Sequence, residues 1–171
     1  MRLDREGDSY VLDLAGREFH LLLGALDEHA IFRGDRFQVL GYSLAEAQVL
    51  SSEVSRLTRV SAQAQGFPPV PVVYRRSPAE VEALHRNALE VFRGEFEVRV
   101  VGAENRIAEC RLTLPRRALE LLAACLEEHI RLVGPGSEVD GFPHSEAQAL
   151  SEALTLALKA AGEGDEGSDG D

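Results

Sequence analysis

Two similar stretches of this chain lie 100 residues apart, and that repetition limits the possible folds more than any other feature. Residues 15–54 and 115–154 align without a gap and share 14 identities in 40 positions. The clearest matches are Leu26–His29 with Leu126–His129, and Glu46–Ser51 with Glu146–Ser151. A constant offset over this length indicates tandem duplication of one structural unit. We therefore expect two copies of the same succession of strands and helices.

Each copy begins with a pattern that is typical of a β-hairpin and continues with two helices. Turn residues separate short apolar runs, which predicts hairpins over 2–14 and 95–114. Apolar residues at three- and four-residue steps then predict helices over 19–30 and 119–130. Ser43 and Glu46 have the spacing of a capping box and predict the start of a second helix, which recurs near residue 146. Residues 37–40 are predicted to form a short strand between the two helices.

The segment that joins the copies repeats neither of them. Its proline-rich first part predicts an extended linker, and Ser77-Pro78-Ala79-Glu80 predicts the start of one helix that ends near Gly94. The predicted division is a first ββαα repeat over 1–60, a connector over 61–94, a second ββαα repeat over 95–161 and a disordered acidic tail over 162–171.

The expected fold class is α+β, with duplicated ββαα units packed about a pseudo-two-fold axis. A unit of about 60 residues buries too little surface for a sufficient core of its own. Two such units can solve this problem by packing against each other as the subunits of a symmetric dimer do. The connector helix would then cover a remaining exposed face.

Charge and cysteine content narrow the classes of function. The formal net charge is −11, which disfavours nucleic acid as a partner because binding its phosphates needs Lys and Arg. No apolar run is long enough for a membrane span, and Cys110 and Cys125 lie in apolar runs that predict buried free thiols. We therefore expect a cytoplasmic monomer or homodimer. Lys159 is the only lysine among 18 basic residues, a bias of GC-rich genomes that favours a bacterial origin.

The only candidate site is the recurring Glu-His pair, which consists of Glu28, His29, Glu128 and His129. If the two copies face each other, these side chains could hold a divalent metal or act as acid and base. A simpler interpretation is that each histidine lies near a helix C-terminus, where the helix dipole favours a cation. No motif of a known catalytic or cofactor site occurs, so no catalytic residue and no cofactor is assigned.

These features favour a non-catalytic interaction or regulatory protein that adapts or neutralises a basic protein partner. A toxin-neutralising immunity protein is one concrete form of this hypothesis, by analogy of class alone. One alternative is a small metal-binding protein or enzyme with its site between the two repeats. The other is a self-assembling structural component whose strand edges pair between chains.

Overall fold

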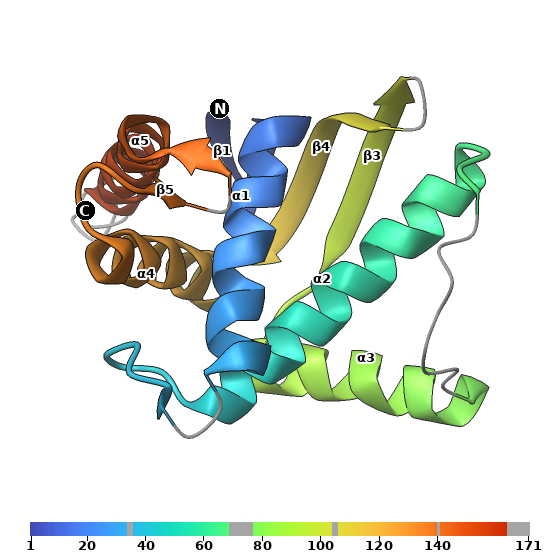
Figure 1. Ribbon diagram of the computed structural model, residues 1–171. Coiled ribbons are helices and arrows are strands. Elements are labelled where there is room, and N and C mark those ends of the chain that lie inside the picture. The colour runs from blue at the N-terminus through green and yellow to red at the C-terminus, as the bar shows by residue number, and fades with distance from the viewer. Residues whose placement is uncertain (34–35, 69–76, 104–105, 140, 164–171) are drawn as a thin grey trace, which may run out of the picture.

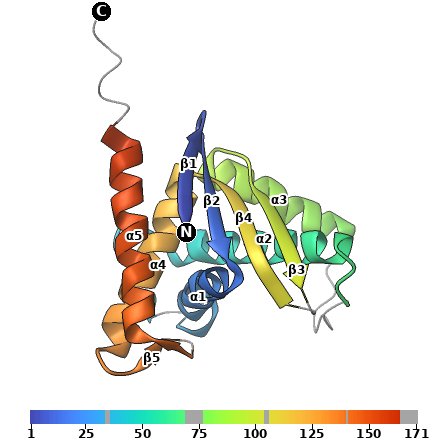
Figure 2. The ribbon, with the colours of Figure 1, turned by 90° about the horizontal axis from the view of Figure 1, so that it is seen from above.

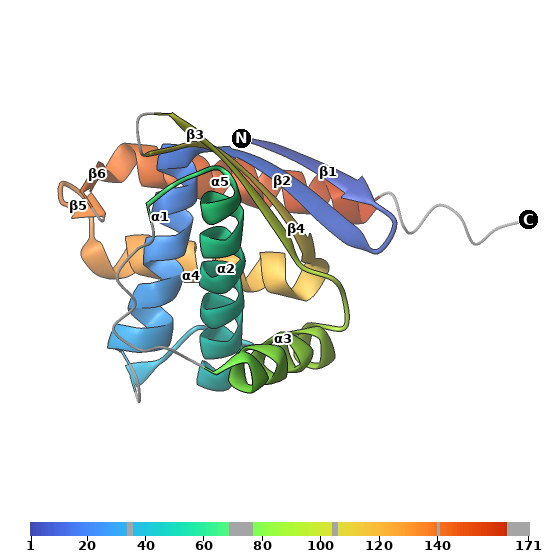
Figure 3. The ribbon, with the colours of Figure 1, turned by 90° about the vertical axis from the view of Figure 1, so that its right-hand side faces the viewer.

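An antiparallel four-stranded sheet forms the centre of the protein, and α-helices cover one of its faces (Figures 1 and 3). The structure, a computed structural model, describes residues 1–33, 36–68, 77–103, 106–139 and 141–163. Five α-helices lie within these ranges. The expected α+β class is therefore confirmed. None of the described helices combines the length and the apolar character that crossing a membrane requires.

The sheet consists of two hairpins joined through their second strands. Its order is β1-β2-β4-β3, with bounds β1 Arg2–Glu6, β2 Ser9–Ala15, β3 Glu97–Ala103 and β4 Arg106–Pro115. In the central β2–β4 pair, Leu12 lies directly opposite Leu112. The two hairpins are joined by the β2–β4 pair, so the sheet requires contacts between residues about as far apart in sequence as the predicted repeats.

The two faces of the sheet differ in polarity because side chains alternate along each strand. Leu12 and Leu14 of β2, with Cys110 and Leu112 of β4, are buried beneath the helices. The other face carries a row of four charged residues at paired positions across the strands: Arg2, Asp13, Arg111 and Arg99. Within this row Arg111 donates two hydrogen bonds to the Asp13 carboxylate, at 2.6 and 2.8 Å.

Each hairpin leads directly into a helix that packs on the apolar face of the sheet. Helix α1 (Gly16–Asp27) follows β2 and continues into a short π-helix, η1 (Glu28–Phe32). Helix α4 (Arg116–Val133) follows β4 and packs against α1. Buried leucines at helical spacing hold this contact together: Leu22 and Leu26 of α1, and Leu119, Leu122 and Leu126 of α4.

A second long helix lies beside each edge of the sheet. Helix α2 (Leu44–Ala64) contacts β3, and α5 (His144–Glu163) contacts β1 (Figure 2). The predicted capping box is confirmed at the start of α2, where Ser43 and Glu46 exchange hydrogen bonds. Helix α5 is preceded by a two-residue ladder between β5 (Glu138–Val139) and β6 (Phe142–Pro143).

The short strand predicted at residues 37–40 is wrong. Residues 37–39 have no regular secondary structure and Leu40 begins a turn, because none of the described strands pairs with them. A two-residue ladder is present instead at the corresponding place in the second half, between β5 and β6. There, positive φ angles at Gly136 (85°) and Gly141 (77°) let the chain turn back on itself within six residues.

The connector helix α3 (Pro78–Phe92) begins as predicted, with a capping box between Ser77 and Glu80 and proline in the first turn. It packs against α2 and buries Ala88 and Phe92. The linker over 69–76 and the acidic tail over 164–171 lie outside the described residues, while residues 162 and 163 belong to α5. The division into four segments stays a prediction.

Candidate functional site

The structure brings the two predicted histidines together inside the protein. His29 lies in η1 and His129 in α4, and their ring centroids are 6.2 Å apart with the planes at 80°. The two residues are only 1% and 5% exposed. Phe37, from the loop before α2, also contacts His29 edge to face, with the ring centroids 6.2 Å apart. The histidine pair therefore lies near the C-terminal ends of α1 and α4, with the ring of Phe37 packed against His29.

Burial lowers the pKa of His29. Removal of the ring from water is the main cause, and electrostatic interactions with Arg33 and the His129 ring add to it, against weaker attraction from Glu128 and Glu28. Neither ring nitrogen of His29 has a hydrogen-bond partner among the described residues. The lowered pKa favours the neutral imidazole, which is the form that could act as a ligand or as a base.

The two predicted carboxylates are directed to arginines instead of to the imidazoles. Arg33 lies 3.5 Å from Glu28, measured from Nε to Oε1. Arg131 donates hydrogen bonds of 2.8 and 2.5 Å to Glu128, which hold the pKa of that carboxyl below its ordinary value. No group of three or more His, Cys, Asp or Glu side chains with metal-binding geometry occurs within the described residues. Of the predicted four-residue set, only the two histidines are brought together.

Apolar side chains are exposed one helical turn beyond the histidine pair. Phe32 follows His29 by three positions and is 75% exposed, and Leu132 follows His129 by three positions and is 41% exposed. Residues three apart on a helix are neighbours on its surface. Ile31 is 61% exposed, and Leu40, three residues after Phe37 in the loop that contacts His29, is 95% exposed. We call Ile31, Phe32, Leu40 and Leu132 the apolar end.

Four acidic residues lie close in sequence to the residues of the apolar end. Asp27, Glu28, Glu127 and Glu128 precede the two histidines in sequence. Ser51 donates a hydrogen bond of 2.6 Å to Asp27, while Glu28 and Glu128 pair with arginines as described. The region where α1 and α4 end therefore combines exposed apolar side chains with carboxylates and arginines.

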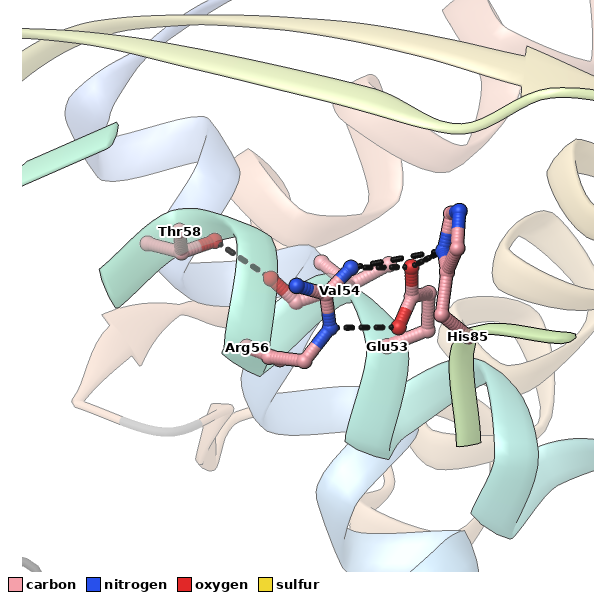
Figure 4. Close-up of polar contacts among 5 residues, drawn as sticks. All are labelled: Glu53, Val54, Arg56, Thr58 and His85. Atoms are coloured by element: carbon pink, nitrogen blue, oxygen red, sulfur yellow. Dashed lines mark hydrogen bonds and ion pairs between the residues drawn. The ribbon is translucent and has the colours of Figure 1, made fainter. Parts of the chain in front are cut away.

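Sequence reasoning missed a buried polar cluster between α2 and α3 (Figure 4). Glu53 is 1% exposed and accepts hydrogen bonds from Arg56 at 2.7 and 2.8 Å. Nδ1 of His85 on α3 lies 2.5 Å from the same carboxylate. Burial alone would raise the pKa of Glu53, but the bonds with Arg56 and His85 outweigh it and lower that pKa. No sequence motif could have revealed the cluster, because Glu53 and His85 are 32 residues apart.

This cluster contains one carboxylate, one guanidinium and one imidazole. A carboxylate bound to Nδ1 orients the imidazole, as in catalytic sites that use histidine as a base. The hydrogen bonds at the cluster, however, join α2 to α3 and involve no hydroxyl or thiol of the described residues. These hydrogen bonds therefore attach α3 to α2.

The recurring acids Glu46 and Glu146 take part in contacts between the two halves. Glu46 accepts hydrogen bonds of 2.8 and 2.6 Å from Arg117, and Glu146 lies 3.1 Å from Arg17. Gln148 donates a hydrogen bond of 2.9 Å to Glu152 on the surface of α5. These arrangements account for the recurring acids without a catalytic role.

Comparison with known proteins gives no family: no protein family's profile matches the chain, and no curated protein or solved structure is significantly similar to it. Function must therefore be inferred from the geometry of the chain's own residues.

Proposed function

We propose that this chain is a non-catalytic interaction protein that binds a basic protein partner through the apolar end. The observation that carries this proposal is the exposure of Phe32 and Leu132, each three positions after a histidine of the buried His29–His129 contact. Large apolar side chains that gather on a surface are typical of contacts with other proteins. Aromatic residues such as Phe32 also belong to the types that are enriched at interfaces.

Charge favours a basic partner over an acidic one. The chain carries a net charge of −11, and Glu127 lies near the apolar end. Complementary charge steers association and raises its rate, while the apolar contacts supply the affinity. One form of this function is neutralisation of a basic toxin or enzyme, and another is an adaptor that links such a protein to a second partner.

Site-specific crosslinking tests the proposal. A photoreactive phenylalanine analogue replaces Phe32 in one variant and Val60 in a matched variant, because Val60 is an exposed apolar residue of α2, 55% exposed. In lysate of the source organism, the Phe32 variant should yield one abundant crosslinked protein of basic isoelectric point, and the Val60 variant should not. The substitution Leu132→Glu should abolish that product. An acidic crosslinked protein, or equal products from both positions, would refute the proposal.

Cytoplasmic location and bacterial origin belong to the same proposal. Cys110 and Cys125 are buried free thiols, which fits a reducing compartment. The acid-rich surface and the arginine bias fit a bacterial protein whose partner is met inside the cell. Fractionation of the source cells, with an antibody against this chain, would test the location directly.

We also infer that the two halves are duplicated ββαα units related by a pseudo-two-fold axis. The register of β2 and β4 supports this, because Leu12 pairs with Leu112, so two residues 100 positions apart meet at the centre of the sheet. His29 and His129 meet in the same way. An axis through these two contacts would relate one half to the other.

Matched contacts farther from this axis add support. Arg17 pairs with Glu146 and lies 4.9 Å from the ring of Phe142, while Arg117 pairs with Glu46 and lies 4.9 Å from the ring of Tyr42. Every member of one set lies 100 positions from a member of the other. In each half, this arginine thus contacts residues at the start of the second helix of the other half.

A chimera tests the duplication. Residues 15–54 replace residues 115–154, and the control chimera carries the same forty residues in shuffled order. The first chimera should keep a cooperative unfolding transition and its helical circular dichroism, since equivalent positions accept each other's residues, and the shuffled one should not. Loss of cooperative folding in both chimeras would contradict the inference.

The approach of the two imidazoles favours one alternative, a metal-binding protein or enzyme with a site between the halves. Zinc commonly binds neutral imidazole nitrogens. If this alternative holds, Zn²⁺ raises the melting temperature of the wild-type chain and not that of His29→Ala/His129→Ala. If the interaction proposal holds without it, Zn²⁺ leaves both melting temperatures unchanged.

A further inference from the structure

A basic cavity lies at the opposite end of α1 from the histidine pair. It has a volume of about 700 Å³ and lies between α1, the C-terminal part of α2 and β4. Figure 1 shows α1 and α2 diverging upward with β4 behind them. Its basic lining residues are Arg17, His20, Arg59 and Arg106, and no carboxylate lines it among the described residues. This is the reverse of the charge of the whole chain, which is −11.

Two of the arginines that line the cavity form no ion pair with a carboxylate of the described residues. Arg17 is already engaged, because it lies 3.1 Å from Glu146. Arg59 and Arg106, in contrast, have no carboxylate within ion-pair distance in the described part of the chain. Guanidinium groups bind carboxylate and phosphate through paired hydrogen bonds. Arg59, Arg106 and His20 all line this cavity.

Close backbone packing fixes the apolar walls of the cavity. A Cβ atom on Gly102 would lie 2.0 Å from Cζ of Phe67, so the ring of Phe67 rests directly on the backbone of β3. The amide of Phe67 also donates a 3.1 Å hydrogen bond to the Ala62 carbonyl at the end of α2. Phe142 and Ile107 add further apolar lining. The cavity therefore offers a flat aromatic wall beside the charged groups.

The geometry points to a binding site for a small organic anion with a planar apolar body. Its carboxylate or phosphate group binds Arg59 and Arg106, and its apolar part packs against Phe67. Small-molecule sites typically combine an apolar lining with a few well-placed polar groups in a cavity of this size. This site is independent of the apolar end, because the two surfaces involve opposite ends of α1.

Fluorescence titration of the full chain tests the site with two related probes. Anilinonaphthalene sulfonate is an aromatic anion, and phenylnaphthylamine has a similar body without the charge. The anionic probe should bind at one site, and Arg59→Ala/Arg106→Ala should weaken it about tenfold or more, because the charged hydrogen bonds are lost. The matched control Arg86→Ala/Arg99→Ala, which removes two exposed arginines elsewhere, should leave the affinity unchanged.

Two displacement measurements distinguish a phosphate ligand from a carboxylate ligand. A single variant tests the site if the double variant does not fold. Displacement of the probe by phenyl phosphate identifies a phosphate ligand, and displacement by benzoate identifies a carboxylate ligand. Arg106→Gln alone, at an exposed strand position, should also weaken the anionic probe if the double variant fails to fold. Equal affinity for both probes, no binding of the anionic probe, or unchanged affinity in the arginine variants would overturn the site.

Discussion

Leu12 of β2 lies directly opposite Leu112 of β4, and both side chains are buried beneath the helices. Side chains opposite each other in an antiparallel pair are close neighbours and contribute strongly to sheet stability. This pair joins the first hairpin to the second at the centre of the only large sheet among the described residues. The stability of the whole chain should therefore be sensitive to either leucine.

Truncation of either central leucine should destabilise the protein by a similar amount. We expect Leu12→Ala and Leu112→Ala each to lower the free energy of unfolding by about 2–5 kcal/mol, because each leaves a cavity in the core. Urea unfolding followed by circular dichroism measures the effect. Val101→Ala, at an exposed position of β3, should change the free energy by less than about 0.5 kcal/mol. A loss for one leucine close to that of the control would contradict the prediction.

Stability should fall in mild acid because of His29. Its pKa in the folded protein lies below its ordinary value, so between the two values the unfolded chain binds a proton that the folded chain does not. The free energy of unfolding is therefore unaffected by this residue above about pH 6.5 and decreases as the pH falls from there toward the lowered pKa. Chemical denaturation at several pH values between 5 and 8 measures the slope.

The variant His29→Asn separates this effect from other titrations. It should flatten the pH dependence between about pH 5 and 6.5, where ordinary histidines titrate and most carboxylates do not. His20→Gln, which removes an exposed histidine from α1, should retain the slope. An unchanged slope in His29→Asn would show that the imidazole is already protonated or accessible to water in the folded protein.

Glu53 should contribute to stability through its bonds to Arg56 and His85. We expect Glu53→Gln to lower the free energy of unfolding by about 1–3 kcal/mol at pH 7, because the partly buried Arg56 guanidinium loses its countercharge. Glu82→Gln removes an exposed pair with Arg86 and should cost no more than about 0.5 kcal/mol. Since the pKa of Glu53 is lowered, its contribution is present above its ordinary pKa and is lost as the pH falls through the lowered one.

Hydrogen exchange should locate the effect of Glu53→Gln in α3. This helix buries only Ala88 and Phe92, so its attachment to α2 depends on the polar cluster more than that of the other helices does. Amides of α3 should exchange faster in Glu53→Gln than in Glu82→Gln, with the sheet unchanged. Uniformly faster exchange throughout the chain would instead assign Glu53 a role in global stability.

The two thiols should react only when the protein unfolds. Burial raises the pKa of Cys110 and of Cys125 to about 12, and the reactive form of a thiol is the thiolate. At pH 8 both should resist a disulfide reagent in the folded state and react at the rate of unfolding. A cysteine introduced at exposed Ala160 should react at once. Rapid labelling of either native thiol would mean that the core opens far more readily than its packing implies.

Local sequence signals predicted much of the secondary structure. The capping residues Ser43 and Ser77 begin helices as expected, because the hydrogen bonds that define a helix start are made within four residues. The same reasoning failed at residues 37–40 and missed the β5–β6 ladder. Strands of two residues depend on tertiary packing, which local patterns do not record.

The sequence predicted the candidate sites only in part, because tertiary packing also decides which distant side chains come together. The recurrence of His29 and His129 drew attention to them, and the fold brings them within 6.2 Å. The basic cavity gave no such signal, since Arg59 and Arg106 lie 47 positions apart on different elements. Glu53 was equally hidden, because a charged residue on a helix is ordinarily exposed.

Two glycines that face different neighbours should respond differently to the same change. A Cβ on Gly16 would lie 1.8 Å from the carbonyl oxygen of Ile107, so Gly16→Ala must push α1 away from β4. We expect it to cost about 2–4 kcal/mol, more than typical overpacking, because backbone cannot move aside. The Cβ that Gly102→Ala adds would instead contact the tip of the Phe67 ring, and that side chain can rotate away.

Gly102→Ala should therefore cost less than about 1.5 kcal/mol and act mainly on the cavity. Displacing Phe67 removes the flat wall against which an apolar ligand would pack, so this variant should weaken the anionic probe while remaining folded. Urea unfolding and the probe titration, performed on the same two variants, distinguish these effects. If Gly102→Ala destabilised the chain as much as Gly16→Ala, the ring of Phe67 would be held as rigidly as the backbone.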